Sequence, residues 1–252
     1  ITHNSTSLAS SGVMLAVTKP GFRTLYVTPL YEQIRRFSNN YVRPFVEHSP
    51  IRSAWIGTGT ANSVLQRTFK NRSLMLFSFA LNDASRIRGV SADRVSIDEV
   101  QDMDIAHFAV IREVISFSDY SLMQYTGTPK TLDNTIEKLW KESSQAEWVI
   151  TCHNAGCGVD NVPSLDMHLE KMIGPYRDDI SEKRPAVICY KCGRPLLPRP
   201  VGMGGYGRWI HKYAERRWSR SAGFHVPQII IPFHYSQPTK WAALLGKREG
   251  WG

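Results

Sequence analysis

Two spacings of hydrophobic residues alternate along the chain up to about residue 145. Short apolar runs bounded by turn residues predict buried strands, and apolar positions three to four residues apart predict helices. The predicted strands are residues 24–27, 74–79, 94–97 and 121–125, and the predicted helices are residues 6–18, 30–46, 104–116 and 135–144. Strands that alternate with helices predict an α/β fold with a mostly parallel sheet flanked by helices.

The pattern changes near residue 147, where short apolar runs are interrupted by Pro, Gly and all four cysteines. We therefore predict an α/β core at residues 1–146, a small cysteine-bearing module at residues 147–200 and a basic linker region at residues 201–252. The chain begins with Ile1 and has no signal pattern, so we expect it to be a piece of a longer protein. No run approaches the roughly 18 apolar residues that a membrane-spanning helix needs.

The composition is that of a folded protein with an excess of positive charge. Hydrophobic residues make up 42% of the 252 residues and charged residues 21%, which excludes a wholly disordered chain. The net charge is +9, and basic residues are dense at Arg194, Arg199, Arg208, Lys212, Arg216, Arg217 and Arg220. Trp209, Tyr213 and Trp218 are interleaved with them. Two interpretations stay open: a surface that contacts nucleic-acid phosphates, or an amphipathic helix whose aromatic residues pack on the cysteine-bearing module. A basic surface can also serve only solubility.

Two adjacent carboxylates, Asp98 and Glu99, follow the apolar strand at residues 94–97. In nucleotide hydrolases such a pair lets the first carboxylate hold Mg²⁺ and the second orient the water that attacks the γ-phosphate. The alternative is a strand that simply ends in a solvated acidic turn. Neighbouring segments favour the first interpretation: Arg88 lies ten residues upstream of Asp98, with Arg86 as a competitor, and the strand at 122–125 leads into Thr126, Gly127 and Thr128.

This order of segments, together with the strand and Thr-Pro turn at residues 25–29, resembles the ATPase domain of the large terminase subunit of tailed phages. That subunit is the motor that pumps DNA into an empty capsid. The resemblance covers nearly the whole chain and implies a P-loop NTPase-like sheet. It implies Mg²⁺ coordination by Asp98, water activation by Glu99, an arginine finger or sensor at Arg88, and coupling of hydrolysis to movement by residues 126–128.

The resemblance also implies partners. These are double-stranded DNA, the portal protein, the small terminase subunit and further copies of the chain in a ring, acting in the cytoplasm of an infected bacterium. The stretch at residues 223–228 resembles the region that leads toward the terminase nuclease, and we expect the nuclease itself to lie outside this chain.

The N-terminus departs from the family pattern. A phosphate loop has the pattern Gly-x-x-x-x-Gly-Lys-Ser/Thr, and its Lys reaches the β- and γ-phosphates. Aligned on the following helix, Ser5 takes the hydroxyl position with Thr6 beside it, Asn4 takes the Lys position and His3 the Gly position. We expect Ser5 and Thr6 to contact ATP, and the missing Lys predicts weak or absent hydrolysis by this chain.

The cysteines form two short pairs, Cys152-x4-Cys157 and Cys189-x2-Cys192, and a Gly follows the second Cys of each. Such turns predict two knuckles that together bind one structural Zn²⁺ through four thiolates, with His153 as a possible replacement for one Cys. Free or redox-active thiols and disulfides are the alternatives.

Two other functions remain open beside the terminase motor. One is a helicase-like ATPase that acts on nucleic acid. The other is a non-catalytic zinc-ribbon protein that binds DNA and has a degenerate nucleotide site, which Asn4 favours.

Overall fold

The computed structural model describes residues 2–47, 50–57, 62–80, 87–130, 134–164, 167–173, 187–196 and 207–231, and positions 239, 240, 243 and 246. The chain divides into two compact units, Ile1–Leu139 and Trp140–Gly252. This boundary lies seven residues before the predicted one at 146/147. None of the helices in the described part of the chain has the length and hydropathy that crossing a membrane requires.

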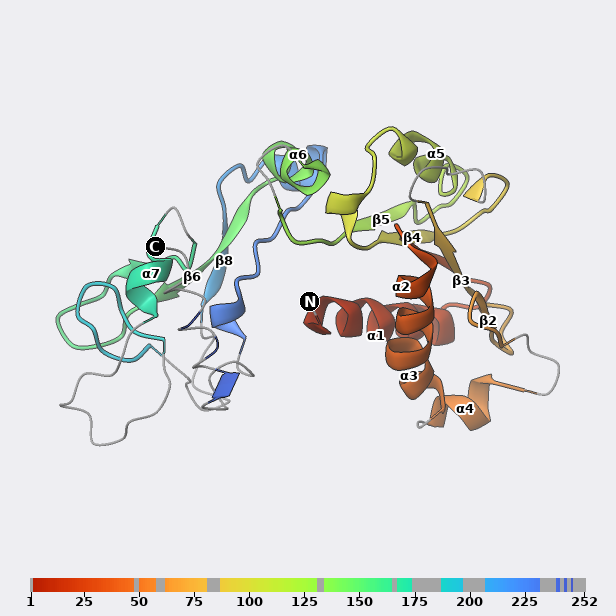
Figure 1. Cartoon of the computed structure of the whole chain (residues 1–252), viewed down its shortest axis with the longest axis horizontal. Coiled ribbons are helices and arrows are strands. Elements are labelled where there is room, and N and C mark those ends of the chain that lie inside the picture. The colour runs from red at the N-terminus through yellow and green to blue at the C-terminus, as the bar shows by residue number, and fades with distance from the viewer. Residues whose placement is uncertain are drawn as a thin grey trace. The chain divides into compact units, whose positions relative to one another are not determined.

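The first unit contains a five-stranded sheet with the strand order β2-β3-β1-β4-β5 (Figure 1). Its strands are β1 (Arg23–Thr28), β2 (Gln66–Thr68), β3 (Leu74–Phe79), β4 (Arg94–Ile97) and β5 (Leu122–Tyr125). All neighbouring pairs are parallel except β2 and β3, which are antiparallel. The prediction of a mostly parallel sheet is therefore confirmed, and the short edge strand β2 is an element that the hydrophobic pattern did not predict.

Helices cover both faces of this sheet, as Figure 1 shows. They are α1 (Thr2–Thr18), α2 (Tyr31–Arg36), the π-helix η1 (Phe37–Val42), α3 (Arg43–Glu47), α4 (Pro50–Trp55), the 3₁₀-helix η3 (Val100–Asp102), α5 (His107–Glu113) and α6 (Thr135–Glu142). The predicted helix at 30–46 is thus one helical stretch with a π segment. Pro44, just after that segment, has no N–H to donate to the preceding turn.

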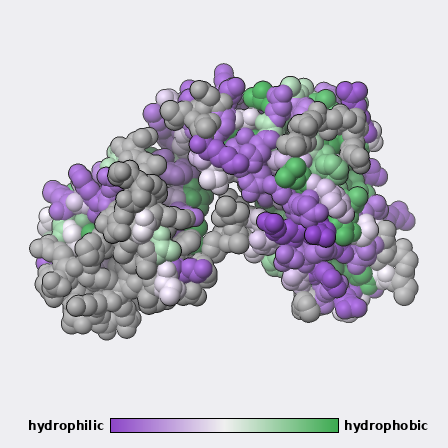
Figure 2. All heavy atoms as spheres, viewed as in Figure 1, coloured by the Kyte–Doolittle hydropathy of each residue, from purple (hydrophilic) through white to green (hydrophobic). Residues whose placement is uncertain are grey.

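The alternation of side chains along β1 explains the two cores. Leu25 and Val27 belong to a buried cluster with Phe108 and Ile111 of α5, whereas Tyr26 belongs to a second cluster with residues of α1, α2 and η1. Successive residues of a strand point to opposite faces, so one buried strand supplies both cores. In Figure 2 the visible face of this unit is mostly hydrophilic, with smaller hydrophobic patches.

The second unit is built on a small antiparallel sheet with the order β7-β6-β8. Its elements are β6 (Ala146–Thr151), β7 (Asp160–Asn161), α7 (Leu169–Met172), β8 (Arg208–His211), α8 (Arg216–Ser219) and the 3₁₀-helix η4 (Gln228–Ile230). The core is small and consists of Ile150, Met172, Ile173, Val187 and Ile229. Strand β8 comes from the stretch expected to be a linker, but it pairs with β6 and is part of this sheet.

Candidate active site and cysteine cluster

The register of the parallel strands places the two predicted carboxylates beside the predicted Thr-Gly-Thr turn. Ile97, the last residue of β4, pairs with Val27 of β1 on one side and with Tyr125 of β5 on the other. Asp98 and Thr126 therefore leave neighbouring strands at the same edge. This is the carboxyl edge, where open parallel sheets bind ligands.

Asp98 is buried and held by three hydrogen bonds. Its Oδ2 accepts from the hydroxyl of Tyr26 at 2.7 Å, and its Oδ1 accepts from the hydroxyl of Thr126 at 2.7 Å and from the backbone N–H of Glu99 at 3.1 Å. An ionised carboxylate offers about four acceptor positions, so little of this capacity remains. The side chain is fixed in place, with room for roughly one further contact.

Tyr26 is a site residue that the sequence analysis did not identify. Burial, followed by the negative charge of Asp98, raises the pKa of Tyr26 well above its usual value, so the phenol stays protonated and donates to Asp98. Its ring stacks on Phe37 of the π-helix with centroids 3.6 Å apart. Nothing local marks this residue, because a Tyr inside a buried strand is also what ordinary core packing produces.

Glu99 adopts a left-handed backbone conformation, with φ 54° and ψ 41°. This conformation costs a non-Gly residue roughly 1–2 kcal/mol, so it is held by surrounding contacts. The side chain is half-buried, and its Oε2 accepts a hydrogen bond from Nε2 of Gln101 at 2.5 Å. The turn redirects the chain immediately after Asp98, so that the two carboxylates do not continue the alternation of the strand.

The other predicted nucleotide contacts are not joined to this group in the described residues. Ser5 is buried in the first turns of α1 and Thr6 is exposed, and neither is among the described hydrogen-bond partners of Asp98 or Glu99. Asn4 lies within α1, but its side chain is outside the described part, as is that of His3. Arg88 is exposed and forms no ion pair with the described residues, while Arg86 lies outside them.

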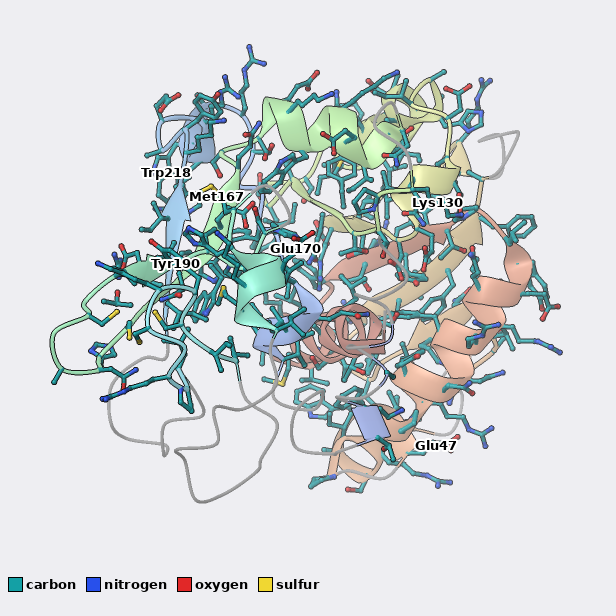
Figure 3. All side chains as sticks on the ribbon, turned by 60° about the vertical axis from the view of Figure 1, so that its left-hand side comes forward. Glu47, Lys130, Met167, Glu170, Tyr190 and Trp218 are labelled. Carbon is teal, nitrogen blue, oxygen red and sulfur yellow. The ribbon has the colours of Figure 1, made fainter. Side chains whose placement is uncertain are left out.

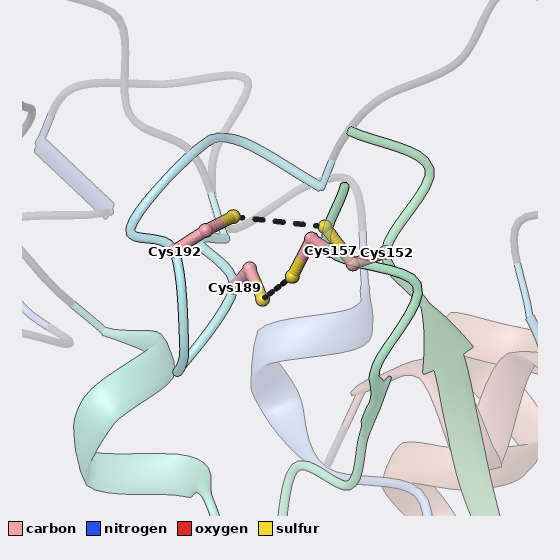
Figure 4. A group of neighbouring side chains, drawn as sticks. All are labelled: Cys152, Cys157, Cys189 and Cys192. Carbon is pink, nitrogen blue, oxygen red and sulfur yellow. Dashed lines mark hydrogen bonds between the residues drawn. The ribbon is translucent and has the colours of Figure 1, made fainter. Parts of the chain in front are cut away.

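The structure brings all four cysteines together, although they come from segments more than thirty residues apart (Figure 4). The Sγ atoms all lie within 4.8 Å of one another, with 3.7 Å between Cys152 and Cys192 and 3.7 Å between Cys157 and Cys189. A tetrahedral site with Zn–S distances of about 2.3 Å has sulfur atoms about 3.8 Å apart. A disulfide needs about 2.05 Å, so the arrangement fits a four-thiolate metal site and not two disulfides.

The backbone around the cysteines has the expected knuckle form. Gly158 and Gly193, each directly after the second Cys of its pair, have positive φ values of 62° and 68°. Positive φ is the reason that Gly is suited to these two positions. His153 is exposed and is not among the clustered ligands, so the geometry favours Cys152, Cys157, Cys189 and Cys192 as the ligand set.

The aromatic residues in the basic stretch separate into two kinds. The ring of Trp209 packs against Trp148 and Phe224, with centroids 5.0 and 5.1 Å away, so it belongs to the packing of this sheet. Trp218, in contrast, is 86% exposed on α8 (Figure 3) and has the guanidinium of Arg217 5.3 Å from its ring. Trp209 packs inward, as the second interpretation expects, but it lies on strand β8 and not on a helix. Trp218 is exposed, and its contact with phosphates stays a prediction.

Comparison with solved structures finds large terminases of bacteriophages. The ATPase domain of the large terminase of Thermus phage P74-26 is 16% identical with a TM-score of 0.42, over 63% of this chain and 66% of that one. The large terminase of another thermophilic bacteriophage is 15% identical with a TM-score of 0.41, over 53% of this chain and 33% of that one. The HK97 bacteriophage large terminase is 14% identical with a TM-score of 0.42, over 54% and 29%. The chain thus spans about two thirds of the first protein and about a third of the others.

The comparison with curated proteins gives no match. A family model does match, and it covers residues 4–209, which is well over half of the chain. Its description is the ATPase domain of the phage terminase large subunit gpA, the family that the order of motifs around Asp98 resembles. This chain belongs to the family of phage terminase large subunits of the gpA type and corresponds to their ATPase domain.

Proposed function

We propose that the chain is the ATP-hydrolysing part of a motor that drives double-stranded DNA into a viral capsid, with hydrolysis at Asp98 and Glu99. The observation that carries the proposal is the placement of this carboxylate pair at the end of β4, in hydrogen-bonding contact with Thr126 after the adjacent strand. Family membership supports the same conclusion. The action takes place in the infected bacterial cell, together with the portal protein and the small terminase subunit.

The surroundings of each predicted site residue are compatible with a specific role in ATP hydrolysis. Asp98 would hold Mg²⁺ through its remaining acceptor capacity, directly or through water, and the bound ion would neutralise charge on the phosphates. Glu99 orients the attacking water and accepts its proton. Thr126, Gly127 and Thr128 report the state of the nucleotide to the rest of the motor. Arg88 is exposed and without an ion-pair partner in the described residues, so it is available to a nucleotide on a neighbouring subunit of a ring.

The N-terminus of α1, where the phosphates of ATP would bind, fits ATP less well than the carboxylate pair does. Asn4 stands where the family pattern has Lys, and an amide supplies no positive charge next to the γ-phosphate. Ser5 and Thr6 remain the proposed hydroxyl contacts at the N-terminus of α1. We therefore expect weak or absent hydrolysis by residues 1–252 alone.

The cysteine cluster has a structural role in this proposal. Four thiolates bind one Zn²⁺ and leave no open position for water, so the ion stabilises the second unit and takes no part in the chemistry.

The substitution Glu99→Gln tests the catalytic assignment in a protein with an intact phosphate loop, because Asn4 predicts weak hydrolysis by this chain. An amide cannot accept the proton of the attacking water, so we expect ATP binding to persist while turnover falls by about 100-fold or more. Glu32→Gln is a matched control, because Glu32 is an exposed residue of α2 whose ion pair within the described part of the chain is with Arg35 on the same helix. Unchanged turnover in Glu99→Gln would contradict the proposal.

One other function has a specific observation in its favour. Asn4 in place of Lys favours a DNA-binding protein with a zinc ribbon and a degenerate nucleotide site. ATP binding in the presence of Mg²⁺, measured by isothermal titration calorimetry on the full-length protein, separates the two. A protein that binds DNA and zinc but no ATP would replace the motor assignment.

A further inference from the structure

Gln101, in η3, contacts two predicted functional segments at once. Its Nε2 donates to Oε2 of Glu99 at 2.5 Å, and its Oε1 accepts from the backbone N–H of Thr128 at 3.1 Å. The carboxylate can only accept and the peptide N–H can only donate, so the two partners determine the orientation of the amide. A primary amide offers a donor and an acceptor on one rigid group, which is what a bridge between these two partners requires.

The backbone around Gln101 is joined to the same turn. The N–H of Val100 donates to the carbonyl oxygen of Thr126 at 3.1 Å, and Nζ of Lys130 lies 2.6 Å from Oδ1 of Asp102. All three residues of η3 therefore contact the segment at 126–130. Figure 3 shows Lys130 near this part of the chain.

Gly127 suits this close approach. A Cβ atom added at Gly127 would collide with Oε1 of Gln101 and would lie 3.3 Å from the backbone nitrogen of Val100. Either the amide of Gln101 or the turn would then have to move. The glycine permits the contact between the turn and the amide in its present position.

The two carboxylates are held in different ways. Asp98 is anchored from inside the sheet by Tyr26 and is also bonded to Thr126, whereas the described hydrogen bond to the carboxylate of Glu99 comes from Gln101. The backbone of Glu99 is in a disfavoured left-handed conformation, so the direction of its side chain depends on such contacts. A displacement of the turn at 126–128 would reach Glu99 through the amide of Gln101.

We propose that Gln101 is a positioning residue that links the carboxylate of Glu99 to the Thr126–Thr128 turn, so that the state of this turn sets the position of the catalytic carboxylate. The catalytic consequence rests on the proposed function. The link itself is a property of the nucleotide-free protein and can be measured without hydrolysis.

Two substitutions distinguish the hydrogen bond from Gln101 to Glu99 from the hydrogen bond between Gln101 and Thr128. Gln101→Glu keeps the shape and the acceptor for Thr128 but loses the donor to Glu99 and places a like charge beside it. Gln101→Leu loses both contacts. Gln124→Glu is the matched control: it adds the same charge on β5, where the new carboxylate can accept from Arg94 and does not contact Glu99.

Steady-state ATP hydrolysis by the protein with an intact phosphate loop and amide hydrogen exchange of the nucleotide-free protein are then compared. For Gln101→Glu we expect kcat to fall by about tenfold or more with little change in KM, and exchange at Thr128 to stay close to wild type. For Gln101→Leu we expect the same loss of kcat and exchange at Thr128 that is faster by about tenfold. Gln124→Glu should match the wild type in both measurements.

Wild-type kcat in Gln101→Glu, or a loss confined to KM, would overturn the positioning role. An unchanged exchange rate at Thr128 in Gln101→Leu would overturn the link to the turn. Failure of the proposed function is a separate result: it appears as normal turnover in Glu99→Gln, and the exchange experiment then still decides whether Gln101 bridges the two segments.

Discussion

At the scale of single residues, the candidate site depends on hydroxyl and amide groups that satisfy two carboxylates. The buried Asp98 accepts from Tyr26 and Thr126, which come from β1 and from the end of β5. A hydrogen bond to a charged acceptor is worth more than a neutral one, and a buried acceptor that loses its donor is costly. These hydroxyls therefore stabilise the fold and fix the site with the same bonds.

Replacement of Tyr26 by Phe should lower the free energy of unfolding by about 1.5–3 kcal/mol, because one donor to a charged, buried carboxylate is lost while the ring stacking on Phe37 remains. Urea denaturation at neutral pH measures the difference in the free energy of unfolding between the variant and the wild type. Tyr31→Phe is the control, since Tyr31 is exposed and packs edge-on against Phe79. Equal stabilities of the Tyr26→Phe variant and the wild type would show that this bond makes no net contribution.

The same bond has a predictable dependence on pH. The pKa of Tyr26 is raised in the folded protein above its ordinary value of 10.0, by burial first and by Asp98 second. The stabilisation is therefore complete below pH 10.0 and decreases at higher pH, as the unfolded chain begins to ionise. The stability difference between wild type and Tyr26→Phe should be constant from neutral pH to about pH 9 and should shrink beyond about pH 10.

At the scale of elements, the second unit depends on its two knuckles. One follows β6 and the other lies between residues 187 and 196, and their sulfur atoms meet in a group of four. Among the described residues, the hydrophobic cluster beside them has five buried members. A metal that joins the two knuckles would supply stability that such a core does not provide.

Cys189→Ser should therefore lose bound zinc, from about one ion per chain to well below that, and should unfold at a lower temperature. His153→Ala is the control, because His153 is exposed and outside the group of four sulfur atoms. Elemental analysis measures the zinc content of each variant, and thermal unfolding measures its unfolding temperature. Zinc loss in His153→Ala, or full zinc content in Cys189→Ser, would contradict the four-thiolate assignment.

For the molecule as a whole, the positive charge bears on the proposed interaction with DNA. The net charge is +9, and the exposed residues Arg217, Trp218 and Arg220 lie together at α8. Neutralisation of phosphates by such residues releases counterions, so affinity depends strongly on salt. An exposed Trp beside an Arg adds an aromatic face that can pack against sugar or base.

The double variant Arg217→Ala/Arg220→Ala should bind double-stranded DNA more weakly, and the slope of log K against log salt should decrease by about 1.8 if each arginine contacts one phosphate. Fluorescence anisotropy over a series of salt concentrations measures the slope. Arg35→Ala/Arg36→Ala removes the same charge from α2 of the first unit. If both double variants change the slope equally, the effect comes from net charge and not from a surface at α8.

The elements that could be predicted are those with local signals. Strands such as β1, β3 and β4 are rich in apolar residues and bounded by turn residues, and the observed β4 has the predicted bounds of residues 94–97 although it includes Arg94 and Ser96. The strands β2, β7 and β8 have two to four residues and no distinct hydrophobic period, and they form by pairing with distant partners. Short edge strands of this kind are determined by tertiary contacts and not by local propensity.

The α/β class, the carboxylate pair after a buried strand, the cysteine pairs with their glycines and the family could all be inferred from the sequence. Each of these is a pattern within a few residues or an order of such patterns. The hydrogen bond from Tyr26 to Asp98, the bridge from Gln101 to Glu99 and Thr128, and the pairing of the cysteines became visible only in the folded chain. Tyr26 and Asp98 are 72 residues apart, and Gln101 and Thr128 are 27 apart. Such contacts depend on strand order and register, which bring distant segments to one edge and leave no trace in the local pattern.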